Sequence, residues 1–584
     1  MKLEKKYLLG IIGLIVILLT GVSYAYFKAR INGDPKSIVI KSKGVYLEYK
    51  GDTTLSSGEI GPGWSVTKTF TVENQGSNTE KYDIYIEDLV NTFVTTGNLQ
   101  YKITSSTGYN MTEFKDIPKS ETATDTVLAY SISIDAGVTQ SYTITLKYND
   151  TDDEQSGDMG KKFSGTLGIQ LPTKKVRTEP TSILTAILDD NPTISERTDF
   201  SVTNVANTTG TLYKTNKTED DSYVYYYSGN TTNNWVKFGT YQVDTIRYRG
   251  TYSSSNTDMY KEYDSLTECQ NGNYFNKNCS TFTYSNAGDD MYWRIIRTNE
   301  DGSIRLLYAG TSPDTTEGYI LRSAYNGLQV AGTGKGSEDT GYMYGGTTSL
   351  ADNRTNTNNS IIKAAIDNWY KNNLLNSYDK YISKSAIYCN DRSISSGSWT
   401  NTESTTNPDN PAFYNAAHAR LGVNKSPSYK CGANESNGLI ESSQSIEDKF
   451  SASTTGGGNG QLKYPIALMT ADEIAFAGNV YGSGMLSPYA WFYTNSKGAS
   501  IVGKEEWYTM TPNEVENSLV AMIYTQFSYS TPFGVEKFSE LLATGSYSQD
   551  SVVRPAISLS SCVKVSGIGT PEDPYVVDYD NSCK

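Results

Sequence analysis

The sequence predicts a mainly β protein of several domains, and three observations lead to that prediction. The chain has 584 residues, too many for one hydrophobic core, which suggests roughly three or four domains. It contains 46 Tyr and 50 Gly beside many Thr, Ser and Asn, a composition that favours strands and turns over helices. Many segments also alternate apolar and polar residues, which is the periodicity of a half-buried strand.

The net charge of the chain is -14, which limits the partners it can have. Binding to a nucleic-acid backbone requires clustered Lys and Arg, so nucleic acid is excluded as an expected partner. Polar neutral or cationic partners remain compatible with this charge.

Residues 1–27 form a signal peptide or a membrane anchor. Lys2, Lys5 and Lys6 precede an unbroken apolar run, and Ser23-Tyr24-Ala25 supplies the small-x-small pattern that a signal peptidase cleaves. If the apolar segment instead continues to Phe27, its length of about 20 residues is enough to span a bilayer. Both alternatives predict an extracellular protein, either secreted or anchored in the membrane.

Residues 30–172 are expected to form an Ig-like β-sandwich. Short alternating segments such as WSVTKTFTVENQGS, KYDIYIEDL and SYTITLKYND are separated by clusters of Gly, Asn, Asp and Ser. About seven such strands over this length are typical of a sandwich of two antiparallel sheets. A charged linker, residues 173–199, follows, and it contains one short helix over Ile183–Leu188.

Residues 200–584 are expected to form one α+β surface domain. Its most regular stretch, Tyr292 to Gly310, predicts a hairpin with a tight turn at Asn299–Gly302. The two carboxylates of this turn lack the further oxygen ligands that calcium requires, so we expect an exposed turn and no metal site. The residues predicted to share the inward face of the hairpin are Trp293, Ile295, Ile304, Leu306 and Tyr308.

A few helices and long loops are expected in the same domain. Ser360 caps the segment IIKAAIDNWYKNNLL, and Thr470 opens a capping box with Glu473. Between these helices lie Gly- and Ser-rich loops, notably SASTTGGGNGQ over Ser451–Gln461.

Six cysteines lie in the carboxy-terminal part, and in a secreted chain an even number indicates disulfides. We expect pairing in sequence order, although six cysteines allow 15 connectivities. A zinc site is the alternative, but it usually requires a CxxC-like pair, which this sequence lacks. The disulfide candidates are Cys269, Cys279, Cys389, Cys431, Cys562 and Cys583.

The sequence assigns no catalytic, cofactor-binding or metal residue. His418 is the one histidine, without a GxSxG or reactive-cysteine setting around it, so a structural role is favoured over a catalytic base. The stretch Asp150–Asp158 imitates a calcium loop, but Gln155 stands where an EF-hand needs Gly, which favours a solvated hairpin tip. Paired carboxylates for glycoside hydrolysis stay open, because a sequence does not reveal their separation.

Aromatic side chains leave two interpretations open. Large rings of this kind pack in a core or, when displayed, stack on sugars and grip proteins. The runs in question are Tyr223, Tyr225, Tyr226 and Tyr227, then Trp491, Phe492 and Tyr493, and finally Trp507 and Tyr508.

The amino-terminal motifs SYAYF, GEIGPGWSVTKTFTVENQGS and KYDIYI resemble the secreted camelysin and TasA-like family of Gram-positive biofilm-fibre proteins. The resemblance covers about a quarter of the chain and implies a β-sandwich. Camelysin-like proteins have been classed as metallopeptidases. That role is not carried over, because this chain has one histidine, outside the sandwich, and no HExxH motif.

The motifs YYYSGN, NNWVKFG, WRIIRTNEDGSIRLLY, VVRPAISL and GTPEDPYVVD resemble uncharacterised extracellular surface domains of Bacillota. More remotely, LMTADEIAFAG and EEWYTMTP resemble segments of C-type-lectin-like and formylglycine-generating-enzyme folds. The first resemblance implies family membership without a known activity, and the second implies only a C-type-lectin-like fold. We expect a non-catalytic adhesin or lectin-like domain that meets a glycan or protein outside the cell. A biofilm-matrix or fibre subunit and an extracellular hydrolase are the alternatives.

Overall fold

The fold was analysed in a computed structural model, which divides into two compact units, Met1–Lys175 and Val176–Lys584. The residues that the structure describes are 37–42, 45–51, 55, 60–111, 113–151, 155–172, 177, 179–201, 210–254, 260–272, 275–325, 341–346, 348–389, 391–399, 413–431, 445–454, 458–480, 490–503, 505, 507–516, 519–528, 535–541 and 551–584. None of the helices among these residues is both long and apolar enough to cross a membrane. The predicted signal or anchor, residues 1–27, lies outside the described residues.

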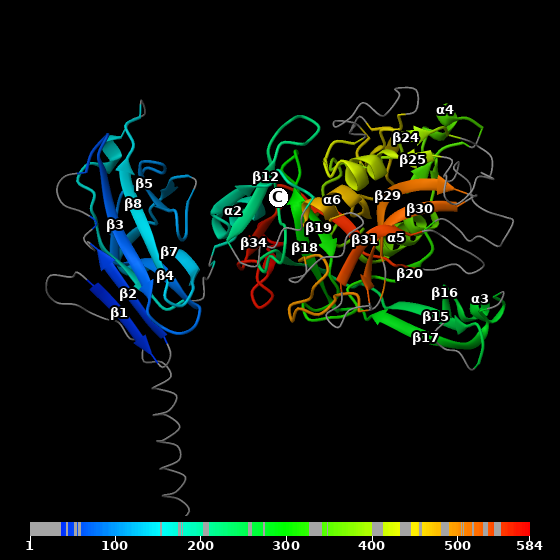
Figure 1. The fold of residues 1–584 in the computed structure, drawn as a ribbon, viewed down its shortest axis with the longest axis horizontal. Coiled ribbons are helices and arrows are strands. Elements are labelled where there is room, and N and C mark those ends of the chain that lie inside the picture. Colours follow the sequence, from blue (N-terminus) through cyan, green and yellow to red (C-terminus); the bar gives the residue numbers. More distant parts are fainter. Residues whose placement is uncertain are drawn as a thin grey trace, which may run out of the picture. The chain divides into compact units, whose positions relative to one another are not determined.

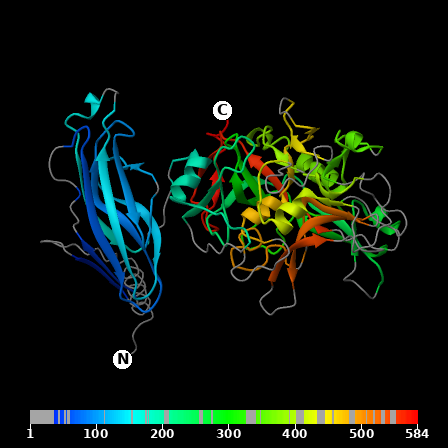
Figure 2. The same ribbon diagram turned by 45° about the horizontal axis from the view of Figure 1, so that its top comes forward.

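The first unit is a β-sandwich of two antiparallel sheets, as the sequence predicts (Figures 1 and 2). Thr and Ser residues alternate with apolar residues along its central strands, so one face of each strand packs inward, as Phe70, Val72, Ile144 and Leu146 do. One sheet has the order β1 (Ser37–Ser42), β2 (Val45–Gly51), β3 (Ser65–Asn74), β8 (Thr139–Tyr148), β5 (Leu99–Ser105) and β6 (Lys115–Asp116). The other has the order β7 (Ser120–Ile134), β4 (Glu80–Asn91) and β9 (Phe163–Gln170).

The second unit is built on a mixed sheet of eleven strands within the described residues. Its main path is β10 (Thr181–Ser182), β34 (Lys564–Ser566), β35 (Tyr575–Val577), β14 (Trp235–Thr240), β18 (Asp290–Thr298), β13 (Val224–Tyr226), β12 (Thr211–Thr215) and β11 (Thr193–Glu196). Three further strands continue from β18, namely β19 (Ile304–Tyr308), β33 (Pro555–Leu559) and β28 (Ile466–Leu468). Segments from both ends of this unit therefore share one sheet.

The predicted hairpin is the centre of this sheet. Strands β18 and β19 pair with Trp293 opposite Tyr308, and Gly302 in the turn has a φ of 76°, which favours glycine. The prediction of a single inward face is too simple, because Arg294 and Arg305 on the opposite face are also buried. The hairpin is buried on both faces because loops and helices cover the side that the alternation assigned to solvent.

The turn matches the expected exposed tip at Glu300 and Asp301, which are both exposed, but Asn299 at its base is buried. The amide of Asn299, which is 6% exposed, donates to the Ser558 hydroxyl at 3.0 Å. Asp301 Oδ2 accepts hydrogen bonds from Ser383 and Ser385, each at 2.9 Å. The acidic turn thus fixes a neighbouring segment of the core.

The predicted helices form where their caps place them. Helix α5 (Ile361–Asn373) begins after Ser360, whose hydroxyl accepts from the Lys363 N–H, and α6 (Ala471–Phe476) begins with the capping box of Thr470 and Glu473. The remaining helices of the described residues are short: α2 (Ile183–Asp190), α3 (Leu266–Gln270), α4 (Leu350–Asn353), and the single turns η1 (Ser156–Asp158), η3 (Asp379–Tyr381) and η4 (His418–Val423).

Residues 173–199 were expected to be a linker, but the strand and helix β10 and α2 within them are part of the second unit. Strand β10 pairs with β34, and Ile183 and Ile187 of α2 belong to the core of that unit. Arg177 also forms an ion pair with Asp190 at 3.1 Å. The short helix was predicted, but its packing onto the sheet was not.

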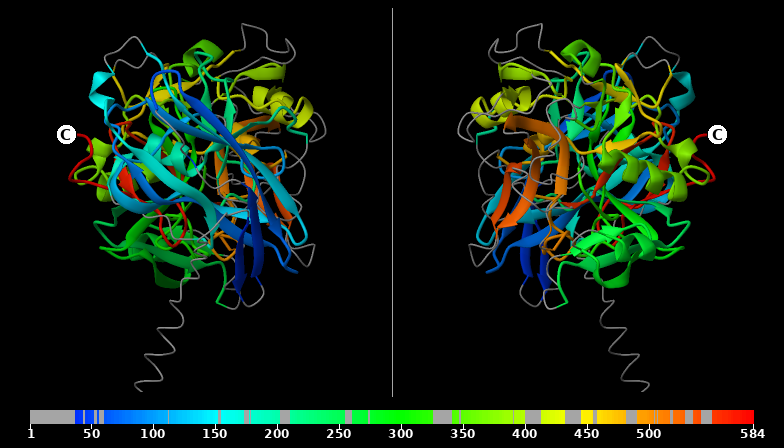
Figure 3. Two further views of the ribbon diagram at one scale, coloured as in Figure 1. Left: turned by 90° about the vertical axis from the view of Figure 1, so that its left-hand side faces the viewer. Right: turned by 90° about the vertical axis from the view of Figure 1, so that its right-hand side faces the viewer.

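Smaller sheets surround the central one. A seven-stranded sheet contains β20 (Arg322–Ser323), β32 (Ser551–Val552), β29 (Trp507–Glu516), β25 (Phe413–Asn415), β24 (Ile394–Gly397), β30 (Leu519–Ser528) and β31 (Val535–Leu541). Strands β15 (Thr245–Thr251), β16 (Tyr260–Tyr263) and β17 (Lys277–Ser285) form a separate sheet at the lower edge of this unit in Figures 1 and 3. The last two small sheets are β21 (Met343–Tyr344) with β22 (Asn358–Asn359), and β23 (Tyr388–Cys389) with β26 (Lys449–Ser451) and β27 (Gly460–Gln461).

Candidate functional site

The six cysteines form three disulfides, Cys269–Cys279, Cys389–Cys431 and Cys562–Cys583. This is the sequence-order pairing that we predicted. Disulfides form and persist in oxidising compartments, so the pairing is compatible with a location outside the cytoplasm.

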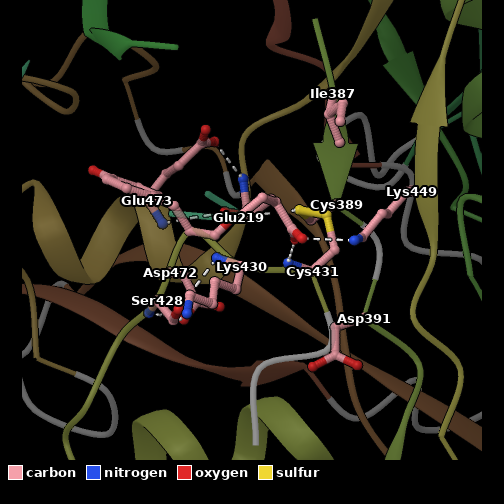
Figure 4. Close-up of a disulfide and its surroundings, with 12 residues drawn as sticks. Glu219, Ile387, Cys389, Asp391, Ser428, Lys430, Cys431, Lys449, Asp472 and Glu473 are labelled. Atoms are coloured by element: carbon pink, nitrogen blue, oxygen red, sulfur yellow. Dashed lines mark hydrogen bonds and ion pairs between the residues drawn. A yellow bond between two sulfur atoms is a disulfide. The ribbon is translucent and has the colours of Figure 1, made fainter. Parts of the chain in front are cut away.

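The disulfide Cys389–Cys431 is surrounded by charged side chains, and Glu219 is the residue that connects them (Figure 4). One carboxylate oxygen of Glu219 accepts the backbone N–H of Cys431, and the other accepts Lys449 Nζ at 2.6 Å. Residues distant in sequence are therefore held together around one disulfide.

Glu219, Cys389 and Cys431 also have ligand atoms within 4.8 Å of one another, a separation that could hold a metal ion. Zinc is bound by thiolates, however, and both sulfur atoms here are joined in a disulfide. With the disulfide intact, the cluster offers only the carboxylate of Glu219, so its chemistry does not fit a zinc site.

A buried ionic network lies beside the same disulfide and encloses a cavity of about 20 Å³, room for one water-sized molecule. Arg420 donates to both oxygens of Asp472, at 2.8 and 2.7 Å, and to Asp391 at 2.9 Å. Arg305 and Arg297 share Glu473 at 3.1 and 3.3 Å. These carboxylates are bound to guanidinium groups, so they hold the fold together and do not form the free pair of acids that glycoside hydrolysis needs.

The pKa values of Asp391 and Arg420 in this network are both raised above their ordinary values, for different reasons. Burial raises the pKa of Asp391, although Arg420 opposes the rise. The two carboxylates next to Arg420 raise the pKa of its guanidinium against the effect of burial. The network is therefore an arrangement of fixed charges in which Arg420 is the central cation.

His418 occupies a structural position. Its ring stacks on Tyr414 with centroids 4.1 Å apart, and Nδ1 lies 3.3 Å from the Asn513 side-chain oxygen. This stacked and hydrogen-bonded ring is compatible with the structural role that the sequence favours.

Asp158, at the end of the imitated calcium loop, is buried and not part of a solvated tip. Its carboxylate accepts from the Tyr148 hydroxyl at 2.8 Å, the Asn98 amide at 3.1 Å and the Val94 N–H at 2.7 Å. Burial acts to raise the pKa of Asp158, but these hydrogen bonds outweigh it and lower the pKa to about 2. The carboxylate thus ties together strands and loops of the sandwich.

Most of the aromatic runs pack in the core. Tyr226, Tyr227 and Trp491 are each at most 1% exposed, and the Trp491 ring nitrogen donates to the Tyr227 carbonyl at 2.9 Å. Tyr223, which is 56% exposed, is the member of the runs that is displayed. The recognition interpretation therefore needs different residues.

A polar groove in the second unit supplies such residues. Its volume is about 710 Å³, in the range of small-ligand sites, which is roughly 300 to 1,000 Å³. One wall comes from β22 and the start of α5, and the other from Ala452, just after β26, and from β27 with the residues on either side of it. The lining residues are Met343, Thr355, Asn356, Thr357, Asn359, Lys363, Ala452, Gly458, Asn459, Gly460, Gln461, Leu462 and Lys463.

The two walls are joined by a buried ion pair, Arg392 Nε to Asp448 Oδ2 at 2.5 Å. Asp448 Oδ1 accepts the side-chain amide of Asn356, on one wall, at 2.8 Å and that of Asn459, on the other, at 2.9 Å. Gly460 allows the walls to approach closely, because a Cβ there would lie 3.2 Å from the Cβ of Asn356 on the opposite wall. This part of the groove is fixed before any ligand arrives.

The rim of the groove carries unused hydrogen-bonding groups. Thr357, Asn359 and Gln461 are exposed, and their side chains form no hydrogen bond with any residue that the structure describes. Met343 and Leu462 are buried and provide an apolar floor. The groove therefore combines an apolar floor with a rim of amides and a hydroxyl.

The sequence did not reveal this groove. The Gly- and Ser-rich stretch Ser451–Gln461 was identified only as a loop, and the Asn- and Thr-rich segment before Ser360 received no assignment. Their polar composition was a signal, but nothing in a single sequence indicates that the two segments meet across Asp448.

Searches of protein-family models, of curated proteins and of solved structures found no match to this chain.

Proposed function

We propose that this chain is a bacterial surface or secreted protein whose second unit recognises a glycan without catalysis. The single observation that carries the proposal is the groove, whose walls are fixed by Asp448 and whose rim presents Thr357, Asn359 and Gln461. Sugars are bound by such amide and hydroxyl groups, and pre-fixed walls reduce the ordering cost of binding.

The proposed location outside the cytoplasm is supported by the three disulfides, together with the signal or anchor expected at residues 1–27. The sandwich is proposed to be Ig-like, in keeping with the resemblance of its motifs to TasA-like proteins. The second unit is proposed to be C-type-lectin-like, because a central sheet there supports long, irregular polar loops.

Binding of the full, oxidised chain to a broad glycan array tests the proposal. We expect binding that is competed by the free sugar and that is weakened by Gln461→Ala. Absence of binding to any glycan would overturn the proposal, as would capture of a protein ligand that sugars do not compete and that Gln461→Ala leaves unchanged.

A fibre subunit is the second candidate function, and one observation favours it. Strand β7 spans 15 residues and pairs only with β4 in the described part of the sandwich. A long unpaired edge can add a strand from another chain. Concentration-dependent filaments of the purified chain, seen by electron microscopy, would support this candidate, and a monomer at all concentrations would exclude it.

A further inference from the structure

The charges of the groove differ from those of the whole protein. The chain has a net charge of -14, yet the charged side chains that line the groove are the two lysines Lys363 and Lys463. The nearby carboxylate of Asp448 is bound by Arg392 and two amides. A positive site thus stands in a negative protein, which selects ligands by charge over short distances.

Only one of these lysines is exposed and outside a close ion pair. Lys363 is 1% exposed, and its Nζ lies 2.7 Å from Asp367 Oδ2, so the two charges compensate each other. Lys463 is exposed and forms no close ion pair with a residue that the structure describes, although its charge acts at longer range to lower the pKa of Asp367. Its Nζ lies 5.3 Å from the centre of the Tyr464 ring, which stacks on Tyr370.

We infer that the groove binds an acidic glycan, whose carboxylate or phosphate pairs with Lys463 while its hydroxyl groups bind Asn359 and Gln461. This inference rests on the proposed function and names the class of its ligand. Uronate residues and phosphodiester-linked residues are both anionic, and the ammonium group of Lys463 can form an ion pair with either.

The test uses the full oxidised chain and matched pairs of acidic and neutral probes. The pairs are oligogalacturonate with its methyl ester, sialylated with asialo glycans, and glycans with and without glycerol phosphate. The variants are Lys463→Gln, Lys463→Arg, which keeps the charge, and Lys371→Gln as a control, because Lys371 is exposed on the same helix as Lys363 but does not line the groove.

We expect preference for the acidic member of at least one pair, and weaker binding as salt increases. Lys463→Gln should reduce the affinity for that member by about 3- to 10-fold, with little change for its neutral form, whereas Lys463→Arg and Lys371→Gln should bind like the wild type. The probe pair whose acidic member binds more tightly than its neutral form shows whether the ligand is a uronate, a sialate or a phosphodiester.

Two outcomes separate the inference from the proposed function. Equal binding of acidic and neutral probes, or no effect of Lys463→Gln on the acidic probe, would overturn the acidic ligand and leave glycan recognition in place. Binding to no probe of either kind would overturn both.

Discussion

Arg392 and Asp448 form an ion pair 2.5 Å long in which both side chains are almost completely buried, at 2% and 0% exposure. The pair lies where two segments rich in Asn, Thr and Gly meet, and it orients the amides of Asn356 and Asn459 toward the same carboxylate. The groove exists because this pair holds its two walls at a fixed separation. A charge pair that is part of the fold thus prepares a surface for recognition.

Removal of this carboxylate should destabilise the second unit. Asp448→Asn leaves the Arg392 charge buried without its partner, which typically costs about 3 to 5 kcal/mol. Urea unfolding measures the loss, and Gln461→Ala, an exposed rim change, serves as the matched control with an expected change below about 0.5 kcal/mol. An Asp448→Asn protein as stable as the wild type would contradict this role.

Arg420 is expected to be as important for the network beside Cys389–Cys431. Arg420→Met places an apolar chain next to Asp391 and Asp472, whose buried charges then lack a cation, at a cost of about 3 to 5 kcal/mol. Thermal unfolding measures this loss of stability. Lys497→Met, which removes the exposed ion pair of Lys497 with Asp314, is the control. Equal melting temperatures for the two variants would refute the network as a stabilising element.

The three disulfides should differ in their contribution according to loop length. The Cys389–Cys431 bridge spans 42 residues and Cys269–Cys279 spans 10. In the chain-entropy model their loss costs about 4 and about 3 kcal/mol, respectively. Urea unfolding of variants in which both cysteines of one bridge are replaced by Ser measures each loss of unfolding free energy. A larger loss for the Cys269–Cys279 bridge than for Cys389–Cys431 would contradict the expectation.

The sandwich should lose stability in acid through Asp158. Because its pKa is lowered to about 2 in the folded protein, below the usual value near 3.9, the stabilisation is fully present above about pH 4 and is lost as the pH falls toward 2. Asp158→Asn should therefore unfold more easily than the wild type at pH 7, and the two should converge near pH 2. Asp150→Asn, on an exposed loop, is the control. A constant difference between Asp158→Asn and the wild type across this range would disprove the assignment.

Local patterns were enough to predict much of the fold. The alternation in WSVTKTFTVENQGS predicts β3, Ser360 and Thr470 mark the starts of α5 and α6, and Gly302 marks the turn of the central hairpin. Each of these depends on residues that are close in the sequence. The pairing of the cysteines was likewise predicted in order.

The groove and the buried ionic network could not be predicted, because they depend on contacts between distant segments. Asp448 meets residues 92 positions away at Asn356, and Arg305 meets Glu473 across 168 positions. The alternation of apolar and polar residues along the hairpin predicts that Arg294 and Arg305 face solvent, but contacts with distant segments bury both. Charged residues on a strand that is covered on both faces have the same local pattern as exposed ones.

Whether the groove binds the glycan is best measured with the strongest ligand of the glycan array. Its affinity is compared between the wild type and the double variant Asn359→Ala with Gln461→Ala. We expect a loss of about 5-fold or more, since each of the two lost hydrogen bonds contributes about 0.5 to 1.5 kcal/mol. Stability should be unchanged, and Asn368→Ala, at an exposed residue outside the groove, should bind like the wild type. Wild-type affinity in the double variant would contradict the assignment of the groove as the glycan site.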